Sequence, residues 1–281
     1  MMDQTKNPQS RVVSTSNGHY VTVDKNVNIY VEDVGEGAPV VFLHGLPVDH
    51  RMYEYQRNVL PFKGIRFIGI DLRGFGKSDR PITGYDYNRL SDDIREVIDQ
   101  LNLDQVTLVG YSMGGAIAVR YMARHNGHGV SKLILAAAAT PLFSQKPDYP
   151  FGLPIEVIDS IIASGYEDRP QMIAAFNSTL FHNKPSQEFM DWYNRLSLET
   201  DAIATFKCLE ALGAEDSRED LAAIKVPTRI FQGMHDQMIP FEPQEKGIEN
   251  AQVIRFENSG HGLWYEEKDK FNEEILKFVQ S

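Results

Sequence analysis

The segment Leu108-Val109-Gly110-Tyr111-Ser112-Met113-Gly114-Gly115-Ala116 decides the fold of this chain. An apolar run ends at Gly110, a serine follows two residues later, and a helix-compatible stretch begins after it. This order predicts a strand, a sharp turn and a helix, the G-x-S-x-G arrangement in which the serine hydroxyl projects clear of the sheet. Glycines flank the turn because a side chain at either position would collide with the adjoining strand or helix.

Around this segment, apolar runs alternate with stretches of helical periodicity. Two short alternating segments near the beginning read as a hairpin, and the later runs have the continuous apolar character of strands buried on both faces. The predicted strands are 19–23, 28–33, 40–43, 67–70, 106–109, 133–135, 228–232 and 252–256. The clearest helices are predicted over 90–101 and 271–279. Strands that alternate with helices predict an α/β fold with a mostly parallel sheet covered on both sides.

The strand pattern stops after Thr140-Pro141 and resumes only at Thr228. The interval contains helical patterns and turn signals but no convincing strand. We therefore expect a helical cap, residues 141–221, inserted after the sixth of eight strands. The core is then residues 19–140 and 222–281, and residues 1–18 form a polar N-terminal extension.

Composition excludes several classes of protein. The 281 residues carry a formal charge of −11, which argues against a nucleic-acid or anionic-membrane partner. No apolar run approaches the ~20 residues needed to span a bilayer. The single cysteine, Cys208, cannot form an internal disulfide and is expected to be a packed small side chain. Without a signal-peptide pattern in the polar N-terminus, a cytoplasmic location is expected.

A serine hydroxyl becomes an effective nucleophile when a neutral imidazole can take its proton and a carboxylate orients that imidazole. In open parallel sheets, functional side chains collect at the carboxyl ends of the strands. Asp236 follows the predicted strand 228–232, and His261 lies between two glycines after the strand 252–256. The chain order Ser112, Asp236, His261 is one in which such triads occur. These three residues are the predicted catalytic group.

Two other polar residues near strand ends are interpreted as structural. Asp71 follows a strand that precedes Ser112 in the chain, and we expect it to hold its loop through Arg73 and backbone amides. His235 points away from the catalytic group if Asp236 faces it, so His235 is expected at the surface.

Acyl transfer also needs two N–H groups aimed at the oxyanion that develops on the substrate. Met113, directly after the serine, is expected to supply one. The loop His44-Gly45-Leu46-Pro47 should supply the other from Leu46, because Pro47 has no N–H to donate. His44 is expected to brace this loop.

Metal and cofactor sites find no support in the sequence. The eight histidines show neither an H-E-x-x-H pattern nor a Cys/His cluster, and no G-x-G-x-x-G follows a strand. We therefore expect neither a metal nor a cofactor.

Four motifs together resemble the α/β-hydrolase superfamily: His44-Gly45, Asp71-Leu72-Arg73-Gly74-Phe75-Gly76-Lys77-Ser78, Gly110-Tyr111-Ser112-Met113-Gly114-Gly115 and Gly260-His261-Gly262. Within that superfamily, the stretch from Ala139 to Pro150 resembles the cofactor-free haloperoxidases and their aryl esterase relatives. The resemblance implies hydrolysis of small aryl or short-acyl carboxylic esters. It also implies a perhydrolase side reaction, in which a peracid made from a carboxylic acid and hydrogen peroxide oxidises halide.

The resemblance further implies substrate-binding roles for Pro47, Phe143, Phe176 and Phe181, although the three phenylalanines could equally be plain cap packing. Family members usually carry an aromatic residue where this chain has Leu46, so the acyl pocket is expected to differ in shape. Pro47 matches the haloperoxidase-like branch. Because it restricts Leu46, it is a candidate for placing a backbone carbonyl where peroxide can donate a hydrogen bond.

Two alternatives stay open at this point. The same triad would serve a lactonase or a carbon–carbon bond hydrolase, and a hydrolase fold can also persist as a non-catalytic ligand-binding protein. The expected partner is a small-molecule ester, and relatives often self-associate, so homo-oligomers are an open expectation. The physiological substrate depends on cap geometry, which residue spacing does not determine.

Overall fold

The structure, a computed structural model, describes residues 18–239, 241–249 and 251–281. The predicted N-terminal extension therefore lies outside the described residues, except for Gly18, which begins the first strand. In the described part of the chain, no helix combines the length and the apolar character that crossing a membrane requires.

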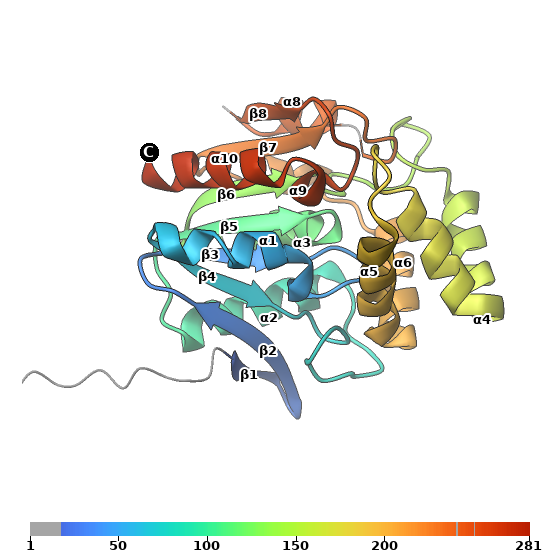
Figure 1. Cartoon of the computed structure of the whole chain (residues 1–281), viewed down its shortest axis with the longest axis horizontal. Helices are drawn as coiled ribbons and strands as arrows, with labels where there is room; N and C mark the ends of the chain where they lie inside the picture. Colours follow the sequence, from blue (N-terminus) through green and yellow to red (C-terminus); the bar gives the residue numbers. More distant parts are fainter. Residues whose placement is uncertain (1–17, 240, 250) are drawn as a thin grey trace, which may run out of the picture.

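Eight strands form one sheet in the order β1-β2-β4-β3-β5-β6-β7-β8 (Figure 1). The strands are β1 Gly18–Asp24, β2 Val27–Val34, β3 Ala38–Leu43, β4 Ile65–Ile70, β5 Val106–Tyr111, β6 Val130–Ala136, β7 Thr228–Gly233 and β8 Gln252–Phe256. β2 pairs antiparallel with both of its neighbours, and every pair from β4 to β8 is parallel. The predicted hairpin and the mostly parallel eight-stranded sheet are confirmed.

The sheet separates two hydrophobic clusters because alternate residues of a strand point to opposite faces. Val41 and Leu43 of β3 belong to one cluster, whereas Val40 and Phe42 belong to the other. All four side chains are fully buried. Continuous apolar runs are therefore what a strand covered on both faces requires.

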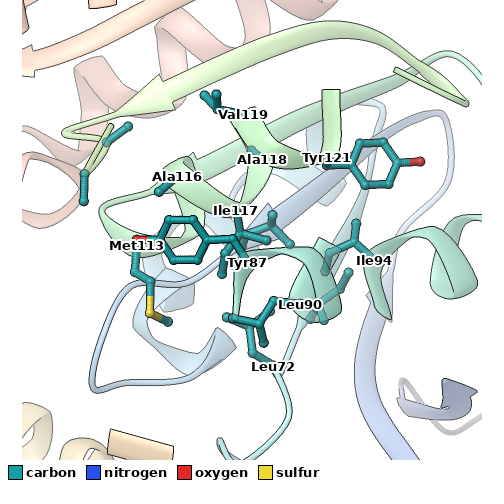
Figure 2. Close-up of a cluster of buried hydrophobic side chains, with 14 of the residues drawn as sticks. Leu72, Tyr87, Leu90, Ile94, Met113, Ala116, Ile117, Ala118, Val119 and Tyr121 are labelled. Atoms are coloured by element: carbon teal, nitrogen blue, oxygen red, sulfur yellow. The ribbon is translucent and has the colours of Figure 1, made fainter. Parts of the chain in front are cut away.

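Helices cover both faces of the sheet, with α2 and α3 on one side and α1 and α10 on the other (Figure 1). Outside the cap, the helices are η1 His50–Tyr53, α1 Glu54–Arg57, η2 Leu60–Lys63, α2 Tyr87–Gln100, α3 Met113–Arg124, α8 Glu242–Gly247, α9 Leu263–Glu266 and α10 Lys268–Gln280. Asp86 caps α2 by accepting a hydrogen bond from the Arg89 N–H. Leu90 and Ile94 of α2 meet Ile117 of α3 in the buried cluster that Figure 2 shows.

Four helices lie between β6 and β7: α4 Ile155–Ser178, α5 Gln187–Glu199, α6 Ala202–Ala214 and α7 Arg218–Leu221. Helices α4, α5 and α6 lie together beyond one end of the sheet (Figure 1). The helical insertion predicted after the sixth strand is thus present. Cys208 of α6 is buried and unpaired, and burial raises the pKa of its thiol, so it packs as a small apolar side chain.

Helix α4 is kinked where the sequence carries Arg169-Pro170. Asp168 leaves helical geometry, with φ −149° and ψ 86°, and its carboxylate accepts a hydrogen bond from the Gln171 N–H at 3.0 Å. Pro170 has no N–H and its ring clashes with the preceding turn, so the helix restarts there with Asp168 as its cap.

Candidate active site

Ser112 occupies the sharp turn between β5 and α3. Its φ of 53° and ψ of −119° place a non-glycine residue in a strained region of backbone space. Hydrogen bonds hold it there: its N–H donates to Ala136 O at 3.0 Å, and its carbonyl accepts from Gly115 and Ala139, each at 2.9 Å. The Ser112 side chain does not cap α3, so its hydroxyl is left for other partners.

Glycine is required at this turn by close backbone contacts. A Cβ on Gly110 would lie 2.5 Å from the carbonyl oxygen of Gly114, and one on Gly114 would lie 2.5 Å from the carbonyl oxygen of Leu43. Any side chain at either position would push α3 away from the sheet and displace Ser112, as predicted for these two glycines from the sequence.

His261 and Asp236 meet at the carboxyl end of the sheet, from the loops after β8 and β7. Nδ1 of His261 lies 2.8 Å from Oδ2 of Asp236, and their side chains are 3% and 0% exposed. The other oxygen, Oδ1, accepts from the N–H groups of Met238 and Ile239 at 2.9 and 3.2 Å. A carboxylate only accepts hydrogen bonds, so Nδ1 carries the proton and Nε2 is left as the basic nitrogen.

The loop that carries His261 is held to the rest of the protein on both sides. Glu266 accepts from the Gly260 N–H at 2.8 Å, and the Gly262 N–H donates to Leu180 O of the cap at 2.9 Å. The ring of His261 lies 5.0 Å, centroid to centroid, from that of Tyr111, the residue before Ser112. The imidazole is therefore fixed beside the elbow.

The loop after β3 reaches the same place. A Cβ on Gly45 would lie 3.0 Å from the Cβ of Ser112, so this loop passes directly over the serine. Among the described residues, none accepts a hydrogen bond from the N–H of Leu46 or of Met113. Two N–H groups left unpaired beside a serine are what an oxyanion site needs.

His44 braces the loop, as expected from the sequence. Its Nδ1 lies 2.8 Å from Gly45 O, and its Nε2 accepts from the Leu72 N–H at 3.1 Å. Burial lowers the pKa of His44, which favours the neutral ring that this pattern requires. The neighbouring Leu46–Pro47 peptide is cis, and Pro47 O accepts from the hydroxyl of Thr200 at 2.8 Å. The loop is thereby tied to the cap.

Two neighbouring cavities lie beneath the cap helices. The inner one, about 10 Å³, is bounded by Leu46 and Pro47 and has no more room than one water molecule needs. The outer one, about 420 Å³, is largely apolar and reaches Met238, two residues after Asp236. Three side chains line both cavities: Ile161, Met172 and Phe176. Another cavity, about 470 Å³, lies elsewhere, between residues 82–86 and α6.

The other two phenylalanines predicted to bind substrate, Phe143 and Phe181, do not line these cavities. Phe143 is buried in the hydrophobic cluster that also contains α2 and α3. Phe181 packs beside Gly262 and makes edge-on contacts with Phe189 and Tyr193. Substrate-binding roles for Phe143 and Phe181 stay predictions, and their contacts are with the protein interior.

Asp71 has different partners from those expected. Arg73 pairs with Asp93 at 2.6 and 2.7 Å, and both side chains are buried. Asp71 instead accepts from Nδ1 of His50 at 2.6 Å and from the N–H groups of His50 and Lys77. Only the backbone-amide part of the prediction is correct, because the fold brings His50, 21 positions earlier in the chain, to Asp71 and turns Arg73 towards Asp93.

His235 is exposed, as expected, but it is not isolated. Its ring stacks on that of His182 from the cap, with centroids 3.6 Å apart and an interplanar angle of 5°. No sequence signal links these two histidines, since the contact joins a core loop to a cap loop.

The fold and this arrangement of residues define an α/β hydrolase, and comparison with known proteins agrees. The profile of the family described as "alpha/beta hydrolase fold" matches residues 38–268, and the chain belongs to that family. Its relatives place it among the non-haem haloperoxidases and esterases of the family.

Three similar proteins illustrate this placement. The AB hydrolase superfamily protein YisY of Bacillus subtilis is 48% identical, over 94% of this chain and 100% of that protein. A putative non-heme chloroperoxidase of Synechocystis is 32% identical, over 93% of this chain and 99% of that protein. The structure of the esterase EaEST from Exiguobacterium antarcticum superposes with a TM-score of 0.92 at 43% identity, over 94% of this chain and 100% of that chain. The protein is thus an enzyme of the α/β-hydrolase type.

Proposed function

We propose that this protein is a serine carboxylic-ester hydrolase that acts through an acyl-enzyme intermediate. The observation that carries the proposal is the 2.8 Å hydrogen bond between His261 and Asp236 beside the elbow serine, Ser112. With Nδ1 bound to the carboxylate, Nε2 is the nitrogen available to take a proton from the serine hydroxyl.

In the first half-reaction, Oγ of Ser112 attacks the ester carbonyl while its proton passes to Nε2 of His261. The tetrahedral intermediate collapses, the bond to the alcohol oxygen breaks, and His261 returns the proton to the leaving alcohol. In the second half-reaction, water attacks the acyl-enzyme, His261 takes its proton and passes it to Oγ, and the carboxylic acid leaves. Asp236 keeps the imidazole in the required tautomer throughout.

The N–H groups of Leu46 and Met113 are assigned the role of stabilising the oxyanion in both tetrahedral intermediates. Their proximity to Ser112 and their lack of an acceptor among the described residues support this assignment. Donors that are already oriented need no reorganisation when the negative charge develops, and loss of one such donor typically costs ~10²–10³ in kcat.

Small aryl or short-acyl esters are the proposed substrates. The inner cavity beside Leu46 and Pro47 supports this choice, because at about 10 Å³ it has little room for an extended acyl chain. The wider, apolar outer cavity would then receive the other arm of the ester, since pockets bury ligands mainly by apolar contact. Pro47 and Phe176 are the substrate-binding residues that these cavities favour.

Perhydrolysis is a second proposed activity of the same site, favoured by the similarity to a protein named as a non-heme chloroperoxidase. Hydrogen peroxide replaces water in the second half-reaction. A bond forms between the acyl carbon and a peroxide oxygen, the bond to Oγ of Ser112 breaks, and the peroxide proton passes through His261 to Oγ. The products are a peracid and free enzyme.

Other parts of the interpretation stay predictions. They are the division into a core of 19–140 and 222–281 and a cap of 141–221, the cytoplasmic location, and self-association. Lactone or carbon–carbon bond hydrolysis would use the same residues, so substrate profiling separates these reactions from ester hydrolysis.

The test is a panel of p-nitrophenyl and phenyl esters of graded acyl length, with and without hydrogen peroxide. Ser112→Ala should lose at least ~10³-fold in kcat, as removal of a nucleophile does in related chemistry. Ser160→Ala, at an exposed serine of α4, is the matched control and should keep full activity. A fluorophosphonate should label the wild-type protein at Ser112 and leave the variant unlabelled. An unlabelled wild type would favour a non-catalytic binding protein.

A further inference from the structure

A second buried His–Asp pair, formed by residues other than those of the candidate active site, lines a pocket of about 370 Å³. His50, at the start of η1, places Nδ1 2.6 Å from Asp71, and the exposed fractions of the two side chains are 7% and 0%. His50 lines the pocket, and among the described residues its Nε2 has no hydrogen-bond partner. The buried imidazole of His50 is thus hydrogen-bonded to Asp71 through Nδ1, and its Nε2 is left for a ligand in the pocket.

Each oxygen of the two buried carboxylates around His50 already accepts a hydrogen bond. Ligand atoms of Asp49, His50 and Asp71 lie within 4.8 Å of one another, which is close enough for a metal site. Asp49, however, is held by Nε and Nη2 of Arg51. Asp71 accepts three N–H groups, two from His50 and one from Lys77. The cluster therefore presents hydrogen-bond donors to the pocket.

Most charged side chains in the wall of the pocket are paired with a side chain of opposite charge. Glu32 is already satisfied by Arg57 at 3.1 Å and by the Tyr30 hydroxyl at 2.7 Å. Arg51 is likewise paired, on Asp49 and on Glu199 of the cap.

Lys77 has no carboxylate partner among the described residues. Its ammonium lies 4.2 Å above the ring of Tyr30 and 3.2 Å from that residue's hydroxyl. The Tyr30 ring in turn lies 5.5 Å from the ring of His50, so Lys77 and His50 flank the same tyrosine. The other acidic side chain of the wall, Glu54, is exposed to solvent.

We propose that this pocket binds a small oxyanion of the phosphate or carboxylate type between Nε2 of His50 and the ammonium of Lys77. Asp71 favours the doubly protonated imidazole, the form in which Nε2 can donate a hydrogen bond. Burial opposes that charge, but the hydrogen bond and the negative charge of Asp71 together raise the pKa of His50. Charge-assisted hydrogen bonds from two cations are the usual means of holding such an anion.

The pocket also touches the cap, since Trp192 of α5 lines it. Trp192 is partly exposed, whereas the other tryptophan of the chain, Trp264, is fully buried. Occupancy of the pocket should therefore be visible in the fluorescence of Trp192.

The test is a titration of the full-length protein with inorganic phosphate and, separately, with acetate, at constant ionic strength set by chloride. Tryptophan fluorescence and calorimetry are the two readouts. The expected result is saturable binding of one anion in the millimolar range or tighter. Lys77→Gln should weaken it at least tenfold, and Lys63→Gln, at an exposed lysine outside the pocket, should leave it unchanged. Ser112→Ala should also bind normally, which separates this pocket from the active site.

His50→Gln should abolish the binding. If the His50 variant does not fold, Lys77→Gln gives an independent answer, because Lys77 is exposed and its substitution should not disturb folding. Tighter binding of phosphate than of acetate assigns the pocket to phosphate-type ligands, and the reverse order assigns it to carboxylates. Equal binding by the Lys77 and Lys63 variants would overturn the proposal. So would the absence of saturation, or binding of Zn²⁺ in place of both anions.

Discussion

Nδ1 of His261 lies 2.8 Å from Oδ2 of Asp236, although the two residues come from loops after different strands and are 25 positions apart. Three hydrogen bonds hold the carboxylate, one from the imidazole and two from backbone N–H groups. Asp236 therefore cannot rotate away, and the orientation of the imidazole is set before any substrate arrives.

Asp236→Asn should lower kcat by about 10⁴ with little change in KM. The amide can donate a hydrogen bond to Nδ1, which favours the tautomer with its proton on Nε2, and that nitrogen then cannot accept a proton from Ser112. Hydrolysis of p-nitrophenyl acetate measures the effect, and Asp220→Asn, at a carboxylate of α7 remote from the triad, is the control. A loss of less than tenfold would contradict the role given to Asp236.

Pro47→Leu should lower the ratio of perhydrolysis to hydrolysis. Proline restricts the residue before it, so the carbonyl of Leu46 is held in one orientation, where peroxide can donate a hydrogen bond to it. Leucine removes that restriction and adds an N–H group. Peracid formation and ester hydrolysis are measured on the same preparation, with thermal unfolding as the check on folding. An unchanged ratio would mean that Pro47 does not select the acyl acceptor.

Phe176→Ala should shift the preference towards longer acyl chains. Phe176 lines both the inner and the outer cavity, so its removal would join them. The ratio of kcat/KM for hexanoate over acetate esters should rise by about tenfold, the lower end of what one methylene group contributes in an apolar pocket. Phe62→Ala, at a side chain that is 85% exposed, should leave the ratio as it is. A rise in both variants would exclude a pocket effect.

The His50–Asp71 pair should make stability depend on pH. His50 has a pKa raised above 6.5 in the folded protein, so its contribution is fully present below about pH 6.5 and is lost as the pH rises through the folded value. Burial works against the charge of Asp71, but its hydrogen bond and charge pairing with His50 hold its pKa below 3.8, so its contribution is lost only as the pH falls through that lowered value. The pair should stabilise most between about pH 4 and 6.5.

Urea unfolding of wild type and His50→Gln at pH 6 and pH 9 measures this dependence. The difference in unfolding free energy between the two proteins should be larger at pH 6. His128→Gln is the matched control, because His128 also pairs with an aspartate, Asp99, but both side chains are more than 40% exposed. Such surface pairs contribute little. A difference that grows towards pH 9 would show that His50 is neutral in the folded protein.

The fold and the meeting of Asp236 with His261 could be predicted from the sequence because both depend on local patterns. Glycines around Ser112 mark a turn that tolerates no side chain, and continuous apolar runs mark strands buried on both faces. Asp236 and His261 each follow a strand, and parallel strands bring their carboxyl ends to one edge. The kink at Arg169-Pro170 also has a local cause, since proline cannot continue the helix.

Other contacts were decided by the tertiary structure alone. Nothing in the residues around Asp71 shows that His50 will be its partner, or that Arg73 will pair with Asp93, because these contacts depend on how the loops pack across the sheet. The stacking of His182 on His235 depends in the same way on where the cap docks.

The shape of the cavities beneath the cap was also decided by the tertiary structure alone. Phe143, Phe176 and Phe181 are the same residue type and have the same predicted role, yet of the three only Phe176 lines the cavities beneath the cap. Periodicity and spacing report which residues share a strand or a helix face, and so they determined the sheet, the elbow and the strand ends that carry Asp236 and His261. They do not report how one helix rotates over a distant loop, so the partners of Asp71, the His50 pocket and the cavity walls followed only from the packed structure.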